Sequence, residues 1–127
     1  MDKVALVNFD IEVGREVIDA LDRDGKNPKV ALWAKLPDYE DWRLVIASDQ
    51  ISQSGSLYGY SQINAAMEKA GIPMRKRPKI SLRPMDKPFI KALRSVFAKA
   101  ADTYGMRLGG QVFGDQYLED AFVYRIH

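Results

Sequence analysis

Apolar residues alternate with polar or small residues in two runs of the first half of the chain, at residues 29–36 and 42–48. An alternation with a period of two is typical of β-strands. The five residues between the runs, Pro-Asp-Tyr-Glu-Asp, have the length of a hairpin turn. Because both strands also carry small or apolar residues on their second faces, we expect them to lie centrally in a sheet that is covered on both sides.

The segment before this hairpin has the spacing of a helix. Its apolar positions 11, 17, 18 and 21 fall on one helical face together with Gly14. We predict Asp10 as the N-cap, because a carboxylate inside the helix would share that apolar face and would be costly to bury. Gly25 suits the left-handed stop after the helix. Residues 3–9 fit either a short strand or an additional helical turn.

A second helix is predicted over residues 60–70. Its inward positions are apolar or aromatic: Tyr60, Ile63, Ala66, Met67 and Ala70. Gly71 follows as a stop signal. The preceding residues 49–59 are polar and rich in Ser and Gly, which predicts a loop. This loop lacks the glycine and lysine spacing of the known phosphate-binding loops, so we interpret it as a polar loop with a helix cap.

A third helix is predicted over residues 88–104. Its apolar residues fall within an arc of about 140° at 100° per residue. They are Phe89, Ile90, Leu93, Val96, Phe97, Ala100, Ala101 and Tyr104. Pro88 is tolerated in a first helical turn, Asp86 lies in the cap region, and Gly105 is a suitable stop.

The remaining strand-like segments complete a prediction of the fold. Residues 79–83 form a short apolar strand, and residues 107–113 and 117–126 flank a turn as a second hairpin. Glycines 109 and 110 indicate a bulge or a close contact in this hairpin. The element order is then α-β-β-α-β-α-β-β. We predict one α+β domain over residues 1–127, with a mostly antiparallel sheet of about five strands and about three helices packed on it.

Composition excludes several kinds of chemistry. The 127 residues include no cysteine and one histidine, His127. Disulfides, thiolate metal sites and a cysteine nucleophile are therefore excluded. A catalytic serine–histidine pair is not expected either, because the one histidine is the last residue of the sequence. We predict no catalytic residue, no metal ligand and no cofactor. No run approaches the roughly 20 apolar residues of a membrane span, and no secretory signal is visible, so we expect a cytoplasmic protein without a membrane partner.

The charge pattern is the strongest functional signal in the sequence. Residues 75–99 carry nine Lys or Arg and a single acid, Asp86, in a chain whose net charge is only +2. The basic residues are Arg75, Lys76, Arg77, Lys79, Arg83, Lys87, Lys91, Arg94 and Lys99. If they gather on one face, they create a positive potential that attracts anions. All of them except Lys99 are our candidate anion-binding or nucleic-acid-binding residues.

Our leading hypothesis is a non-catalytic binding or accessory protein whose basic segment engages an anionic partner, either nucleic acid or an acidic protein surface. Lys87, Lys91 and Arg94 share one flank of the predicted third helix, and Arg75–Arg77 precede the strand that leads into it. Packing of that strand beside the helix would bring the two groups together. The plainer alternative is that these side chains are solvated and cover the edges of the core with their stems.

Two other functions remain open. The acidic residues Asp38, Glu40 and Asp41 lie in the first turn, and Glu119 and Asp120 in the last strand. Carboxylates of this kind could serve a metal-dependent hydrolase or nuclease. A homo-oligomeric scaffold, in which the basic segment meets acidic regions of neighbouring copies, is the third hypothesis. Trp33 and Trp42 flank the first turn and fit either an exposed aromatic pair or the core, and the core is favoured.

Two segments resemble a family of small bacterial proteins of unknown function. One comprises Ala31-Leu32-Trp33 with the run Trp42–Ser48, and the other is Leu118–Ile126. The resemblance implies a single intracellular α+β domain and carries no activity. The Arg75–Lys79 cluster is not part of it, so a role for this cluster is argued from the residues alone.

Overall fold

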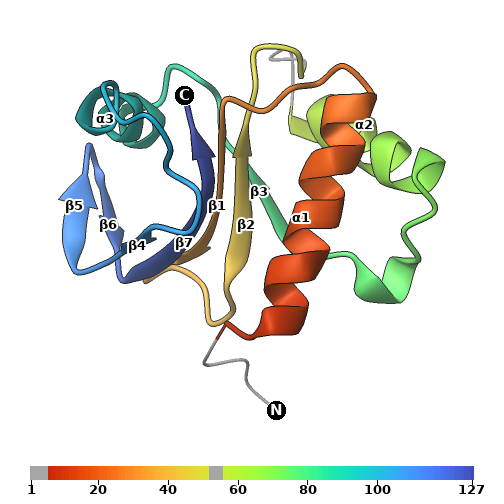
Figure 1. The fold of residues 1–127 in the computed structure, drawn as a ribbon, viewed down its shortest axis with the longest axis horizontal. Helices are drawn as coiled ribbons and strands as arrows, with labels where there is room; N and C mark the ends of the chain where they lie inside the picture. Colours follow the sequence, from red (N-terminus) through yellow and green to blue (C-terminus); the bar gives the residue numbers. More distant parts are fainter. Residues whose placement is uncertain (1–5, 52–55) are drawn as a thin grey trace.

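A five-stranded sheet divides the molecule into two packed faces (Figure 1). The computed structural model describes residues 6–51 and 56–127. The strand order is β3-β2-β1-β7-β4. The strands are β1 (Val30–Lys35), β2 (Arg43–Ala47), β3 (Ile80–Leu82), β4 (Arg107–Leu108) and β7 (Asp120–Ile126). All neighbouring strands are antiparallel except β2 and β3, which are parallel. The predicted α+β class with a mostly antiparallel sheet is confirmed.

The predicted first hairpin lies at the centre of this sheet. Strand β1 pairs with β2 from Val30 opposite Ala47 to Ala34 opposite Arg43. On its other side β1 pairs with β7, with a register shift between Ala31 and Leu32. Every residue of β1 except Lys35 is buried. This burial explains why both faces of the strand are apolar or small.

Helices α1 (Asn8–Arg23) and α2 (Ser56–Lys69) cover one face of the sheet (Figure 1). They end as predicted, because Gly25 and Gly71 adopt φ angles of 76° and 75° directly after them. Helix α2 begins earlier than predicted: residues 56–59 are helical, whereas residues 52–55 of the predicted loop lie outside the described residues.

The predicted N-cap of α1 is wrong. The helix begins at Asn8 with Val7 as its N-cap, so Asn8 and Phe9 are helical, whereas residues 3–5 of the ambiguous segment lie outside the described residues. Asp10 lies inside the first turn and is only 7% exposed. Its carboxylate accepts a hydrogen bond from the backbone N–H of Val7 at 3.1 Å. That hydrogen bond and the positive end of the helix dipole offset the cost of burial on which the prediction relied.

Helix α3 (Pro88–Val96) and a two-stranded hairpin cover the opposite face. The helix is shorter than the predicted 88–104 segment. Phe89, Ile90 and Leu93 are buried as expected, but Val96 is 63% exposed and the helix ends there. Asp86 does not cap it either, because the N-cap is Lys87 and no side chain supplies a cap hydrogen bond.

The second predicted hairpin is divided into four strands, of which β4, β5 and β6 are only two or three residues long and β7 has seven. Strands β5 (Gln111–Phe113) and β6 (Gln116–Leu118) pair with each other, while β4 and β7 belong to the large sheet. The break falls at Gly109 and Gly110. A Cβ at Gly109 would lie 2.6 Å from the backbone oxygen of Glu119, so the predicted close contact is found there. No helix within residues 6–51 and 56–127 is long and apolar enough to cross a membrane.

Candidate functional site

The eight candidate basic residues form two groups at opposite ends of β3. Arg75, Lys76, Arg77 and Lys79 lie in and after the short 3₁₀ helix η1 (Met74–Lys76), just before β3 begins. The others follow the end of that strand: Arg83, Lys87, Lys91 and Arg94. Figure 1 shows that β3 leads from the η1 end of the molecule to α3, which lies across the sheet from α1 and α2. The structure therefore does not bring the whole block to one surface.

Three of the four residues in the first group have acidic partners. The Arg77 guanidinium lies 2.8 Å from Glu68, and the Lys79 ammonium lies 2.5 Å from Asp41. Lys76 lies 3.9 Å from Glu16, which is a weaker pair. Arg75 is exposed and makes no ion pair or side-chain hydrogen bond with any other described residue.

Arg77 has a structural role as well as a charge. Its side chain is only 12% exposed, and its Nε donates to the backbone oxygen of Ile72 at 2.9 Å. Together with the contact to Glu68, this bond ties the connection before β3 to the end of α2. Arg77 therefore fixes the position of η1 rather than presenting a charge to solvent.

The second group is more dispersed. The Arg83 Nε donates to the hydroxyl of Ser81, and its guanidinium lies 5.7 Å from the centre of the Phe89 ring. The Arg94 Nε donates to the backbone oxygen of His127 at 2.6 Å. Lys87, the N-cap of α3, and Lys91 within that helix are exposed, and neither side chain contacts an acid in the described part of the chain. Lys87 lines an open pocket of about 500 Å³ with Pro84 and Met85, but the acidic residues Asp49 and Asp86 also line it, so this pocket is not a purely basic site.

The first group lines a pocket of about 320 Å³, which we call the basic pocket. Helix α1 contributes Phe9, Asp10 and Val13 to its lining. The first hairpin contributes Trp33, Asp41 and Trp42, and the η1 connection contributes residues 75–79. The pocket therefore combines apolar side chains with a positively charged rim.

The two tryptophans form a buried wall of this pocket. Trp33 and Trp42 are 3% and 4% exposed, so the predicted core role is confirmed. The Trp33 Nε1 donates to the backbone oxygen of Asp10 and to the hydroxyl of Tyr124, both at 3.1 Å. The Trp42 Nε1 is buried and has no hydrogen-bond partner among the described residues. A buried N–H without an acceptor is costly and is usually explained by a role or a ligand.

The parallel pairing of β2 with β3 brings the η1 connection to the first hairpin. Leu44 lies opposite Ile80, so the residues just before them, Asp41–Trp42 and Lys79, meet at the same end of the sheet. Sequence reasoning missed this neighbourhood because it treated the 79–83 strand only as the path to α3. The signal was available, since a strand, a helix and a strand in succession favour a parallel crossover.

The carboxylates of the hydrolase hypothesis do not gather. Asp41 contacts Lys79, whereas Asp38 and Glu40 are exposed in the turn. The Arg107 Nη2 donates to both carboxylate oxygens of Asp120, at 3.0 and 2.9 Å. The Glu119 carboxylate lies 3.9 Å from the Lys35 ammonium. No group of three acidic or histidine side chains within the described ranges could hold a metal ion.

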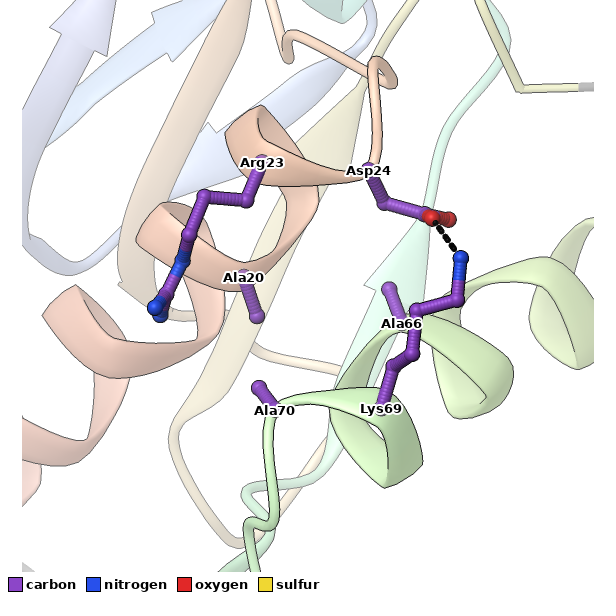
Figure 2. Close-up of a pocket in the computed structure, with 6 residues that line it drawn as sticks. All are labelled: Ala20, Arg23, Asp24, Ala66, Lys69 and Ala70. Carbon is purple, nitrogen blue, oxygen red and sulfur yellow. Dashed lines mark hydrogen bonds and ion pairs between the residues drawn. The ribbon is translucent and has the colours of Figure 1, made fainter.

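A second pocket of about 200 Å³ lies between the C-terminal ends of α1 and α2. Figure 2 shows a floor of three alanines, Ala20, Ala66 and Ala70, with the Asp24 carboxylate and the Lys69 ammonium in contact at 2.7 Å above one side. That hydrogen bond lowers the pKa of Asp24. Arg23 points away from this pair. The charges of Asp24 and Lys69 satisfy each other and the Arg23 Nε donates to the backbone oxygen of Asp19, so we assign the pocket a packing role.

Comparisons with protein-family models, with curated proteins and with solved structures find no match for this chain. The resemblance to a family of small bacterial proteins therefore stays a prediction.

Proposed function

We propose that this protein is a non-catalytic binding protein that takes an anionic ligand in the basic pocket. The proposal narrows the sequence hypothesis from residues 75–99 to the η1 connection, where Arg75–Lys79 border a cavity. One observation carries it: Arg75 is exposed and without an acidic partner in the described structure, at a pocket whose apolar wall holds the unpaired indole N–H of Trp42.

Electrostatics support an anion at this place. Of the two carboxylates in the lining, Asp41 is held by Lys79 and Asp10 accepts a hydrogen bond from the N–H of Val7. The start of α1 also contributes the positive end of its helix dipole. A guanidinium such as that of Arg75 binds carboxylates and phosphates through two parallel hydrogen bonds.

The proposal can be tested by NMR. Titration of the labelled protein with inorganic phosphate should shift the backbone amides of Arg75, Lys76, Arg77 and Lys79 and the indole N–H of Trp42 in a saturable manner. Arg75→Ala should remove these shifts. Lys91→Ala is the matched control, because Lys91 is also exposed and unpaired in the described structure but lies on α3, across the sheet. Shifts confined to α3, or none at residues 75–79, would overturn the proposal.

A further inference from the structure

The number of unpaired charges at the basic pocket limits the kind of anion that it can bind. Four basic residues line it, but Lys76, Arg77 and Lys79 have the partners Glu16, Glu68 and Asp41. Within the described structure this leaves Arg75 as the lining cation without a partner. A nucleic-acid backbone gains affinity by engaging several cations at once, each of which replaces a bound counterion. One available guanidinium suits one anionic group.

The walls of the pocket select for an apolar body beside that group. Phe9 is 59% exposed although it is a large apolar residue, and it lies at the pocket with Val13 and Pro78. The buried rings of Trp33 and Trp42 close the pocket on the side of the sheet. The volume of about 320 Å³ is at the lower end of the range for small-molecule sites, about 300 to 1,000 Å³.

The unpaired indole of Trp42 supplies a third recognition element. Its Nε1 is out of contact with solvent in the structure, so an acceptor reaches it only when the pocket wall adjusts to admit one. A ligand that carries an acceptor atom, such as a carboxylate or phosphate oxygen or an ether, would then satisfy the orphaned donor. Trp42 is thus both a determinant of specificity and a spectroscopic reporter of binding.

Resting on the proposed function, we infer that the ligand is a small amphipathic anion: one carboxylate or phosphate attached to an aromatic or aliphatic body. Arg75 holds the anionic group, the body lies against Phe9, Val13 and the tryptophan wall, and the Trp42 N–H contacts an acceptor of the ligand. Carboxylate and phosphate share this chemistry, and the experiment distinguishes them.

The test uses four probes with the full chain: benzoate, phenyl phosphate, their neutral analogue benzamide, and inorganic phosphate. The readout is the indole N–H resonance of Trp42, assigned with a Trp42→Phe variant. We expect benzoate or phenyl phosphate to give a saturable shift at concentrations at least tenfold lower than inorganic phosphate, and benzamide to give none. The better of the two anions identifies the head group. Arg75→Ala should weaken binding about tenfold or more, because it removes a charge-assisted contact.

Different failures have different meanings. If inorganic phosphate binds at residues 75–79 as well as phenyl phosphate does, the anion site stands and the amphipathic ligand is wrong. A labelled single-stranded oligonucleotide is the further comparison. If the oligonucleotide binds more tightly than the small anions, and its affinity falls more than about tenfold between 50 and 200 mM salt, several basic side chains contact its phosphates. That result would overturn the small-ligand inference alone. If no anion shifts Trp42 or residues 75–79, both proposals are overturned.

Discussion

The indole N–H of Trp33 donates to the hydroxyl of Tyr124 at 3.1 Å, and this bond joins strands β1 and β7 beneath helix α1. The Tyr124 hydroxyl donates onward to the backbone oxygen of Ile11 at 2.5 Å. The Trp33 N–H is shared with the backbone oxygen of Asp10. One short chain of hydrogen bonds therefore holds the first turns of α1 against the sheet and positions the wall of the basic pocket.

Gly14 makes this close approach possible. A Cβ at this position would lie 2.8 Å from the Trp33 Nε1 and equally close to the Tyr124 ring. For Gly14→Ala, the clash should cost about 1 to 3 kcal/mol, offset by at most about 1 kcal/mol of helix propensity. The free energy of unfolding, measured by urea denaturation, should therefore fall. Glu12→Ala on the exposed face of α1 is the control and should change it by less than about 0.5 kcal/mol. Equal or higher stability of Gly14→Ala would contradict the packing described.

Tyr124 should also make stability depend on alkaline pH. Burial is the main cause that raises the pKa of Tyr124 far above its ordinary value. Above about pH 10 the unfolded state releases the phenol proton, whereas the folded state keeps it. The stabilisation that the buried neutral phenol provides is therefore complete below about pH 10 and is lost as pH rises above that value. We expect the Tm of the wild type to fall more steeply between pH 9.5 and 11.5 than that of Tyr124→Phe. Parallel curves for the two proteins would show that Tyr124 does not contribute.

The central hairpin and the helix stops were predictable because local patterns decide them. Nearly every residue of β1 and β2 is buried, and the apolar and small residues of these segments indicated this. Gly25 and Gly71 adopt the left-handed conformation that other residues avoid, so they marked the helix ends. The third helix was predicted too long because its apolar pattern serves two different faces. Leu93 points from α3 into the core on that side of the sheet, whereas Tyr104 packs edge-on against Phe122, which belongs to the core on the α1 side. A helical wheel cannot show that the chain changes sides between them.

The candidate site was predictable only in part for a similar reason. The charge block identified Arg75–Lys79, but sequence spacing could not show that β3 separates them from α3 or that most of them have acidic partners. The partners Glu16, Asp41 and Glu68 come from α1, the turn between β1 and β2, and α2, and tertiary packing alone brings them to the η1 connection. The pocket wall at Trp33 and Trp42 was correctly predicted to be buried, without any signal that the basic connection covers it.

The structure separates the roles of two neighbouring arginines. Arg77→Ala should lower the free energy of unfolding by about 1.5 to 3 kcal/mol, because it removes charged hydrogen bonds to Ile72 and Glu68 from a nearly buried side chain. Arg75→Ala should leave the Tm unchanged within about one degree, because a surface residue without partners contributes little. Thermal unfolding of both variants measures this difference. A large loss of stability in Arg75→Ala would show that this side chain has a structural role and is not free to bind an anion.

The contact between Asp24 and Lys69 can be checked directly. The hydrogen bond from Lys69 is the main cause that lowers the pKa of Asp24. The ionised Asp24 carboxylate therefore stabilises the folded state at pH values above the ordinary aspartate pKa, and this stabilisation is lost as pH falls through the lowered pKa. In Lys69→Met the pKa of Asp24 should rise toward the ordinary value, although the Lys26 ammonium remains 3.5 Å away. A carboxyl-carbon NMR titration measures this change. Lys99→Met, which removes an exposed lysine elsewhere, should leave the Asp24 titration unchanged.

The hydroxyl of Tyr60 closes the outer edge of β3. It accepts a hydrogen bond from the Leu82 N–H at 2.9 Å and donates to the backbone oxygen of Ile80, so one side chain of α2 takes the place of a neighbouring strand. Unpaired edge strands invite pairing with other chains. Tyr60→Phe should therefore lower the free energy of unfolding by about 0.5 to 1.5 kcal/mol and increase self-association at high concentration.

The matched control for the Tyr60 prediction is Tyr58→Phe, which removes a hydroxyl from a side chain of the same helix that is 59% exposed. Light scattering across a concentration series and urea denaturation give the two readouts. If Tyr60→Phe remains as monodisperse as Tyr58→Phe but is less stable, the hydroxyl contributes to packing without protecting the edge. If neither property changes relative to the control, water replaces the hydroxyl at no cost, and the edge of β3 is protected by other means.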